Sequence, residues 1–171
     1  MASYREFPLS TVIYNTATLG GAMVVGAIIL AQLGAWALAG YLLLVLLAVG
    51  GTMGSVCARC GYYGHRCALG LGKPVALLFR KGREDRFLHT APQFIAVLLV
   101  MLALILPIAG WVVLLNRGVS AWRLVQLVGM VGLLLAGLIP HPWLVCSHCR
   151  QGECGLCPVG RQFCKTRERR G

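Results

Sequence analysis

The longest uncharged stretch of the chain constrains its fold more than any other feature. No Asp, Glu, Lys or Arg occurs from Phe7 to Ala58, a run of 52 residues. One helix of that length would measure about 78 Å, whereas the hydrocarbon core of a bilayer is roughly 30 Å thick. The run must therefore fold back on itself, and the polar and glycine-containing stretch Gln32–Ala35 is the best place for a turn. We predict membrane-spanning helices at about Asn15–Leu33 and Trp36–Ser55.

The second half of the chain repeats this pattern. An uncharged run from Phe87 to Asn116 contains a third predicted span at about Phe94–Leu115. A fourth is predicted at about Leu124–Ile139, where Pro140 and Pro142 end the helix. With 58% hydrophobic and only 12% charged residues, the chain has about half the charge of a soluble domain. The expected fold is an all-α integral membrane bundle of four helices, built from two helix hairpins.

These spans divide the chain into four segments. Residues 1–56 form the first hairpin and residues 94–139 the second. Residues 57–93 form a cysteine-rich loop, in which Lys73–Lys81 has the pattern of a short interfacial helix with Pro74 in its first turn. Residues 140–171 form a cysteine-rich basic tail.

The positive charges predict the orientation. The N-terminus, the central loop and the tail must share one side of a four-helix bundle, and they hold 14 of the 16 Lys and Arg residues. The opposite side has only Arg117 and Arg123. The positive-inside rule therefore places both termini and the central loop in the cytoplasm of a prokaryotic inner or plasma membrane. The net charge of +11 then indicates attraction to anionic lipids, and no fold motif points to nucleic acid.

All eight cysteines fall on this predicted cytoplasmic side. Because the cytoplasm is reducing in most organisms, clustered thiols there indicate metal ligands rather than disulfides. Two segments offset by 89 residues resemble each other, as Val-Cys-x2-Cys-x6-Cys-Ala-Leu-Gly and Val-Cys-x2-Cys-x7-Cys-Pro-Val-Gly. Each follows a predicted span. The candidate ligands are Cys57, Cys60, His65, Cys67, Cys146, Cys149, Cys154, Cys157 and Cys164.

Two arrangements of ligands fit these spacings. In the first, Cys57, Cys60, Cys146 and Cys149 form one four-thiolate site, and Cys67, Cys154, Cys157 and Cys164 form a second. In the second, each segment closes its own site. Those sites use Cys57, Cys60, His65 and Cys67 and, in the tail, Cys146, Cys149, Cys154 and Cys157.

The metal is also left open between zinc and an iron–sulfur cluster. The stretch CARCGYYGH, starting at Cys57, resembles the start of retroviral-type zinc knuckles, although the next cysteine comes too early. Its CGY also resembles the first C-x2-C of rubredoxins. The pair Cys157-Pro158 resembles the end of bacterial ferredoxin cluster motifs, with a different spacing. Two metal sites, of zinc or iron–sulfur, are expected.

Two histidines are candidates for a quinone or haem site. His89 precedes the third span and His141 follows the fourth, so both are expected near the same membrane surface. The alternative interpretation is a pair of ordinary interfacial histidines. Small residues spaced four apart, such as Ala22 and Gly26 or Gly132 and Ala136, predict close helix packing within the bundle or against a partner.

No catalytic constellation is present in the sequence. The spans carry no ionisable Asp, Glu, Lys or Arg, and only five acidic residues exist in the whole chain. We therefore expect a noncatalytic anchoring or docking subunit of a larger membrane complex, with structural zinc. The first alternative is an iron–sulfur subunit that relays electrons between a soluble partner and quinone. The second is a membrane thiol oxidoreductase, like the four-helix disulfide-bond-formation and vitamin-K-reductase families, although their cysteines occupy different turns.

Overall fold

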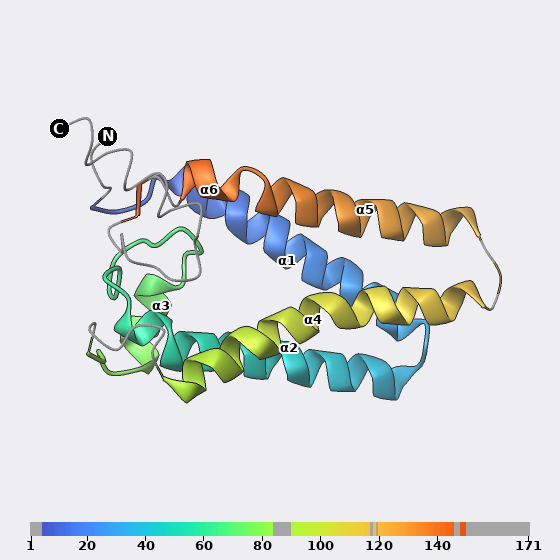
Figure 1. Cartoon of the computed structure of the whole chain (residues 1–171), viewed down its shortest axis with the longest axis horizontal. Coiled ribbons are helices and arrows are strands. Elements are labelled where there is room, and N and C mark those ends of the chain that lie inside the picture. The colour runs from blue at the N-terminus through green and yellow to red at the C-terminus, as the bar shows by residue number, and fades with distance from the viewer. Residues whose placement is uncertain (1–4, 84–89, 117, 119, 146–147, 150–171) are drawn as a thin grey trace.

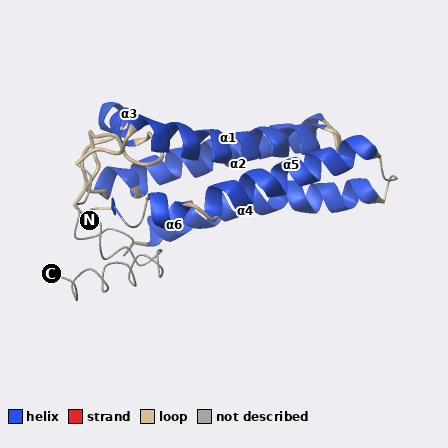
Figure 2. Ribbon diagram, turned by 90° about the horizontal axis from the view of Figure 1, so that it is seen from above, coloured by secondary structure: helices blue, strands red, loops and turns tan. Residues whose placement is uncertain are grey.

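Four long helices form the body of the molecule in a computed structural model that describes residues 5–83, 90–116, 118, 120–145 and 148–149. They are α1 (Leu9–Ala31), α2 (Ala35–Ser55), α4 (Ala91–Leu115) and α5 (Ala121–Leu138). Each belongs to a helical stretch long and apolar enough to cross a membrane, which confirms the four predicted helices. Figure 2 shows them side by side, and all regular structure in these residues is helical.

Three short helices complete the fold. A 3-10 turn, η1 (Cys57–Arg59), follows α2 directly, and α3 (Gly72–Leu78) overlaps the predicted interfacial segment Lys73–Lys81. The last, α6 (His141–Leu144), follows Pro140, where α5 was predicted to stop. In Figure 1 all three lie at the same end of the bundle. We call this the cysteine-bearing end, because residues 56–83 and Cys149 lie here.

All four long helices begin earlier than predicted, and side-chain caps set the N-termini of two of them, α4 and α5. The first starts at Leu9, behind Pro8 in an extended conformation, six residues before the predicted start. Ahead of α4, Thr90 and Gln93 form a reciprocal capping box. At α5 the Ser120 side chain accepts a hydrogen bond from the Arg123 backbone N–H.

The opposite end of the bundle contains tight connections. The α1–α2 turn lies at the predicted place, and its Gly34 has a φ of 137°, which favours glycine. After α4, the guanidinium of Arg123 donates a hydrogen bond of 2.8 Å to the Leu114 carbonyl. The Trp111 indole N–H donates one of 2.9 Å to the Arg123 carbonyl. Arg123 therefore fastens the end of α4 to the start of α5.

Helix packing crosses between the two sequence hairpins. The closest pairs are α2 with α4 and α1 with α5, and α1 also packs on α4, whereas α4 and α5 make little contact with each other. This arrangement is visible in Figure 1. Three helices meet at Gly26 of α1, where an added Cβ would lie 2.7 Å from both the Pro107 ring and the Tyr41 hydroxyl. The Ala22 and Gly26 pair is therefore used for packing inside the bundle.

Polar side chains inside the bundle are bonded mainly to nearby backbone. On α1, buried Asn15 donates to the Thr11 carbonyl over 2.9 Å, and Thr18 donates to the Tyr14 carbonyl over 3.0 Å. Such bonds satisfy polar groups without water, as a helix in lipid requires. The fully buried Gln93 of α4 donates over 2.9 Å to the Ser55 carbonyl at the end of α2.

Candidate functional site

Three cysteines pack against one buried hydrophobic cluster at the cysteine-bearing end. The cluster, called here the Tyr62 cluster, consists of Phe7, Tyr62, Ala68 and Val145. Packed against it are Cys60 and Cys67, which follow α2, and Cys149, which follows α6. Two segments about 80 residues apart in the chain thus contribute cysteines to one small region.

Each cysteine after α2 lies in or beside a tight backbone turn. The Cys60 N–H donates to the Cys57 carbonyl over 3.2 Å, and the Gly70 N–H donates to the Cys67 carbonyl over 3.0 Å. Gly70 has a φ of 73°, and an added Cβ there would lie 3.0 Å from Val12 of α1. The positive φ favours glycine at this position, and a larger residue would also press on Val12.

The fourth described cysteine, Cys57, occupies the neighbouring cluster. It packs with Met53 of α2, Ala58 and Val75 of α3, which form a separate buried group. Its thiol still lies within electrostatic range of Cys67 and Cys60. The four cysteines that the structure describes are half-buried thiols.

Hydrogen bonds hold the loop after α2 against other parts of the chain. The Phe7 N–H donates to the Arg66 carbonyl over 3.0 Å, and the Tyr62 hydroxyl donates to the His148 carbonyl over 3.4 Å. The rings of Phe7 and Tyr62 are 5.2 Å apart between centroids, at 51°. The loop is therefore fixed to the segment before α1 and to the segment after α6.

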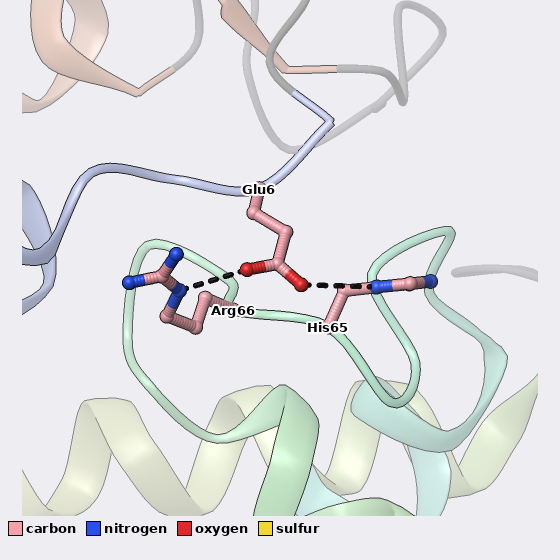
Figure 3. A network of polar contacts seen from close by, with 3 residues as sticks. All are labelled: Glu6, His65 and Arg66. Carbon is pink, nitrogen blue, oxygen red and sulfur yellow. Dashed lines mark hydrogen bonds and ion pairs between the residues drawn. The ribbon is translucent and has the colours of Figure 1, made fainter.

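Glu6 adds an electrostatic clamp to the same loop (Figure 3). Its carboxylate accepts a hydrogen bond of 2.8 Å from the Arg66 guanidinium and lies 3.3 Å from Nδ1 of His65. The bond from Arg66, and after it the contact with His65, hold the pKa of the Glu6 carboxyl below its ordinary value of 4.5. Both partners are partly exposed, so solvent weakens the attraction.

The predicted ligands are thus only partly assembled in the described structure. Cys60, Cys67 and Cys149 pack against the Tyr62 cluster and Cys57 against the neighbouring one, whereas the His65 ring is directed to Glu6. Within residues 5–83, 90–116, 118, 120–145 and 148–149, no group of three or more His, Cys, Asp or Glu side chains is close enough to hold a metal ion. The remaining candidates lie outside the described residues: Cys146, Cys154, Cys157, Cys164 and His89.

The suggested quinone or haem site has one member in the described structure. His141 lies at the start of α6, with its Nδ1 3.3 Å from Oδ1 of the buried Asn15 on α1. The other member, His89, lies outside the described residues, so the predicted pairing of the two histidines stays a prediction.

Sequence reasoning missed the residues that hold the thiols in place. Phe7 and Tyr62 were not singled out, and neither was Glu6. Glu6 could have been singled out from the sequence, since it is the only acidic residue before Glu84. Aromatic residues carried no such signal, because nothing in their local pattern distinguishes a buried partner from an interfacial ring.

In the part of the chain that the structure describes, these features define an all-helical protein with four helices able to cross a membrane and cysteines gathered at one end. No family model, curated protein or solved structure matches the chain.

Proposed function

We propose that this chain is an integral membrane protein whose cytoplasmic end binds structural zinc through cysteines and forms a docking surface for a partner subunit. The membrane assignment is supported by four helices of suitable length and composition. The 14 of 16 cations that the sequence assigns to one side support a cytoplasmic cysteine-bearing end.

One observation carries the metal proposal. Cys60 and Cys67 pack against the same buried cluster as Cys149, although they come from segments that follow different helices. Thiols gathered from separate segments are typical of a structural metal site in a reducing compartment. Cys57 and Cys60 lie at the two ends of one tight backbone turn, and Cys67 begins another.

Metal binding would require the thiols to draw closer than they are in this structure, or to be completed by other cysteines of the tail. A zinc ion bridging the two segments would connect the end of α2 to the end of α6. Since α2 packs on α4 and α5 on α1, such a site would link the two helix pairs. A rigid surface at this end is what a docking role needs.

Anaerobic purification of the full chain, followed by elemental analysis and a visible spectrum, tests the proposal. We expect colourless protein with about two zinc ions per chain, on the four-ligand rule for structural sites. Less than one metal per chain would contradict it. Brown protein that bleaches with dithionite would replace zinc by an iron–sulfur cluster and favour electron transfer.

A matched pair of variants locates the site. Cys149→Ser removes a thiol on the Tyr62 cluster. It should lower the metal content by about half an ion per chain or more. Ser55→Ala, at the end of α2, removes a polar group whose hydroxyl bonds only to its own helix, at Gly51. It should leave the metal content unchanged. Equal metal content in both variants would show that Cys149 is not a ligand.

A further inference from the structure

The short helix α3 buries one of its large apolar side chains and exposes two others. Val75 is fully buried against Met53 of α2 and Ala58 of η1. Two and three residues later, Leu77 is 87% exposed and Leu78 is 70% exposed. Two adjacent leucines on the outside of a connecting segment are costly in water, because each leaves most of its apolar surface hydrated.

This exposed pair is held rigidly. The Tyr63 hydroxyl donates to the Phe79 carbonyl over 2.7 Å, and the Gly82 N–H donates to the Ala58 carbonyl over 2.8 Å. At the start of α3, the Gly64 N–H donates to the Gly72 carbonyl over 3.0 Å. The segment is therefore fixed on both sides of the leucines and cannot fold them inward without breaking these bonds.

Contacts of Phe79 give the level of the segment along the bundle. An added Cβ at Gly54 would lie 2.9 Å from the Phe79 ring, so the ring rests on the last turn of α2. If α2 spans a bilayer, its last turn lies where acyl chains give way to headgroups. Leu77 and Leu78 are then beside the membrane boundary rather than in open water.

The charge next to the leucines matches a lipid surface. No acidic residue occurs in 72–83, while Arg80 is exposed and follows Phe79 directly. Lys81 and Arg83 also follow, but both make other contacts, so the argument rests on Arg80. An arginine beside an acyl-level anchor is well placed to bind a lipid phosphate through its planar fork of N–H groups.

The small size of the patch argues against a protein partner here. Two leucines and one ring edge are far less than the roughly 800 Å² that each partner buries in a standard interface. Lipid requires no such minimum area, because each buried methylene contributes independently.

We propose that α3 with residues 79–83 is a membrane-surface anchor, in which Leu77 and Leu78 enter the acyl boundary and Arg80 binds the phosphate of an anionic lipid. This inference rests on the proposed membrane insertion but not on metal binding. Since α3 is bonded to the loop that carries Cys60 and Cys67, lipid bound here would also fix the depth of the thiols at the membrane surface.

Hydrogen–deuterium exchange of the full chain in lipid nanodiscs tests the proposal. Nanodiscs of pure phosphatidylcholine are compared with nanodiscs containing phosphatidylglycerol. We expect slower exchange of residues 76–82 when phosphatidylglycerol is present. Native mass spectrometry should show phosphatidylglycerol retained in preference to phosphatidylcholine.

Two charge-matched variants isolate Arg80. Arg80→Gln should lower the apparent affinity for phosphatidylglycerol about fivefold, which corresponds to roughly 1 kcal/mol for one cation at a lipid surface. Arg5→Gln removes another exposed cation at the same end and should change the affinity much less. The double variant Leu77→Ser/Leu78→Ser should lose protection of residues 76–82 in both lipids, while α2 and α4 stay protected.

The outcomes separate this inference from the membrane proposal. Equal exchange in the two lipids, with Arg80→Gln behaving as Arg5→Gln, would overturn the lipid site while leaving four protected spans intact. Protection that depends on the leucines but not on phosphatidylglycerol would also overturn it, because recognition of the anion would be absent. A chain that fails to enter nanodiscs would overturn both proposals.

Discussion

The Tyr62 hydroxyl donates a hydrogen bond of 3.4 Å to the backbone carbonyl of His148, joining segments 86 residues apart. This bond connects the loop after α2 to the segment after α6. On one side the loop contacts α1, where the Thr16 hydroxyl donates to the Leu69 carbonyl over 3.4 Å. On the other it contacts α2 through the cluster around Val75. The thiol-bearing loop therefore links the two helix pairs at this end.

Removing the aromatic partner of Tyr62 should destabilise this link. Phe7 is 1% exposed and packs its ring on Tyr62. We expect Phe7→Ala to lower the free energy of unfolding by about 3 kcal/mol, because a large cavity replaces a buried ring. Reversible unfolding in mixed detergent micelles measures the change. Phe94→Ala is the control, since that ring is 67% exposed on α4, and equal losses in both variants would contradict the packing described here.

Gly26 should tolerate no larger residue. Its neighbours Pro107 and Tyr41 leave no room for a Cβ, so Gly26→Ala should destabilise the bundle by about 1–3 kcal/mol through overpacking. Gly20 lies on the same helix with nothing within 4 Å of an added Cβ. Gly20→Ala should be neutral or stabilise by up to about 1 kcal/mol. The same unfolding assay decides, and a stable Gly26→Ala variant would exclude the close contact of three helices.

Two buried glutamines should respond differently to the same change. Gln93 bonds to the Ser55 carbonyl and the Thr90 N–H, so Gln93→Leu should destabilise the protein by about 1 kcal/mol. Gln126 accepts a bond from Gln32, but among the described residues its own amide nitrogen has no acceptor. Gln126→Leu removes that unsatisfied donor and should be nearly neutral. The reverse order of stabilities in the unfolding assay would contradict these bonding patterns.

The Glu6 clamp should be visible as a shifted titration. Arg66, and then His65, lower the pKa of the Glu6 carboxyl in the folded protein. Its contribution to stability is therefore fully present above the ordinary value of 4.5 and is lost as the pH falls through the lower, folded value. NMR of carboxyl-labelled glutamate follows the titration directly, and Glu6→Gln assigns the signal.

A charge-matched pair tests the cause of that shift. Arg66→Gln should move the pKa of Glu6 back toward 4.5, whereas Arg5→Gln should leave it much closer to the wild-type value. A Glu6 signal that titrates at 4.5 or above in the unmodified protein would show that the clamp does not form.

The helices were predictable because uncharged runs determine them almost alone. Fifty-two uncharged residues cannot form a single span, and Gly34 marks the turn. The helix starts were less predictable, because they depend on short-range capping. Thr90 with Gln93 extends α4 to Ala91, and Ser120 extends α5 to Ala121, both upstream of the predicted bounds.

Helix pairing could not be derived from the hairpin order. Helix pairing depends on which small residue packs against which bulky one, as Gly26 packs against Pro107. The sequence alone does not show these contacts. For the candidate site, the cysteine spacing singled out Cys57, Cys60 and Cys67 as one group in the chain. The contact of Cys149 with the loop after α2 depends on Tyr62 and Phe7, whose burial is a tertiary property.

A cysteine-by-cysteine alkylation footprint of the native protein tests the shared thiol site most directly. The anaerobically purified chain is treated with iodoacetamide with and without a zinc chelator, and each peptide is quantified by mass spectrometry. We predict that Cys60, Cys67 and Cys149 are all protected before chelation and become reactive together after it, because one site involves both segments. Full alkylation of all three in the untreated native protein, with no effect of the chelator, would contradict metal binding at this end.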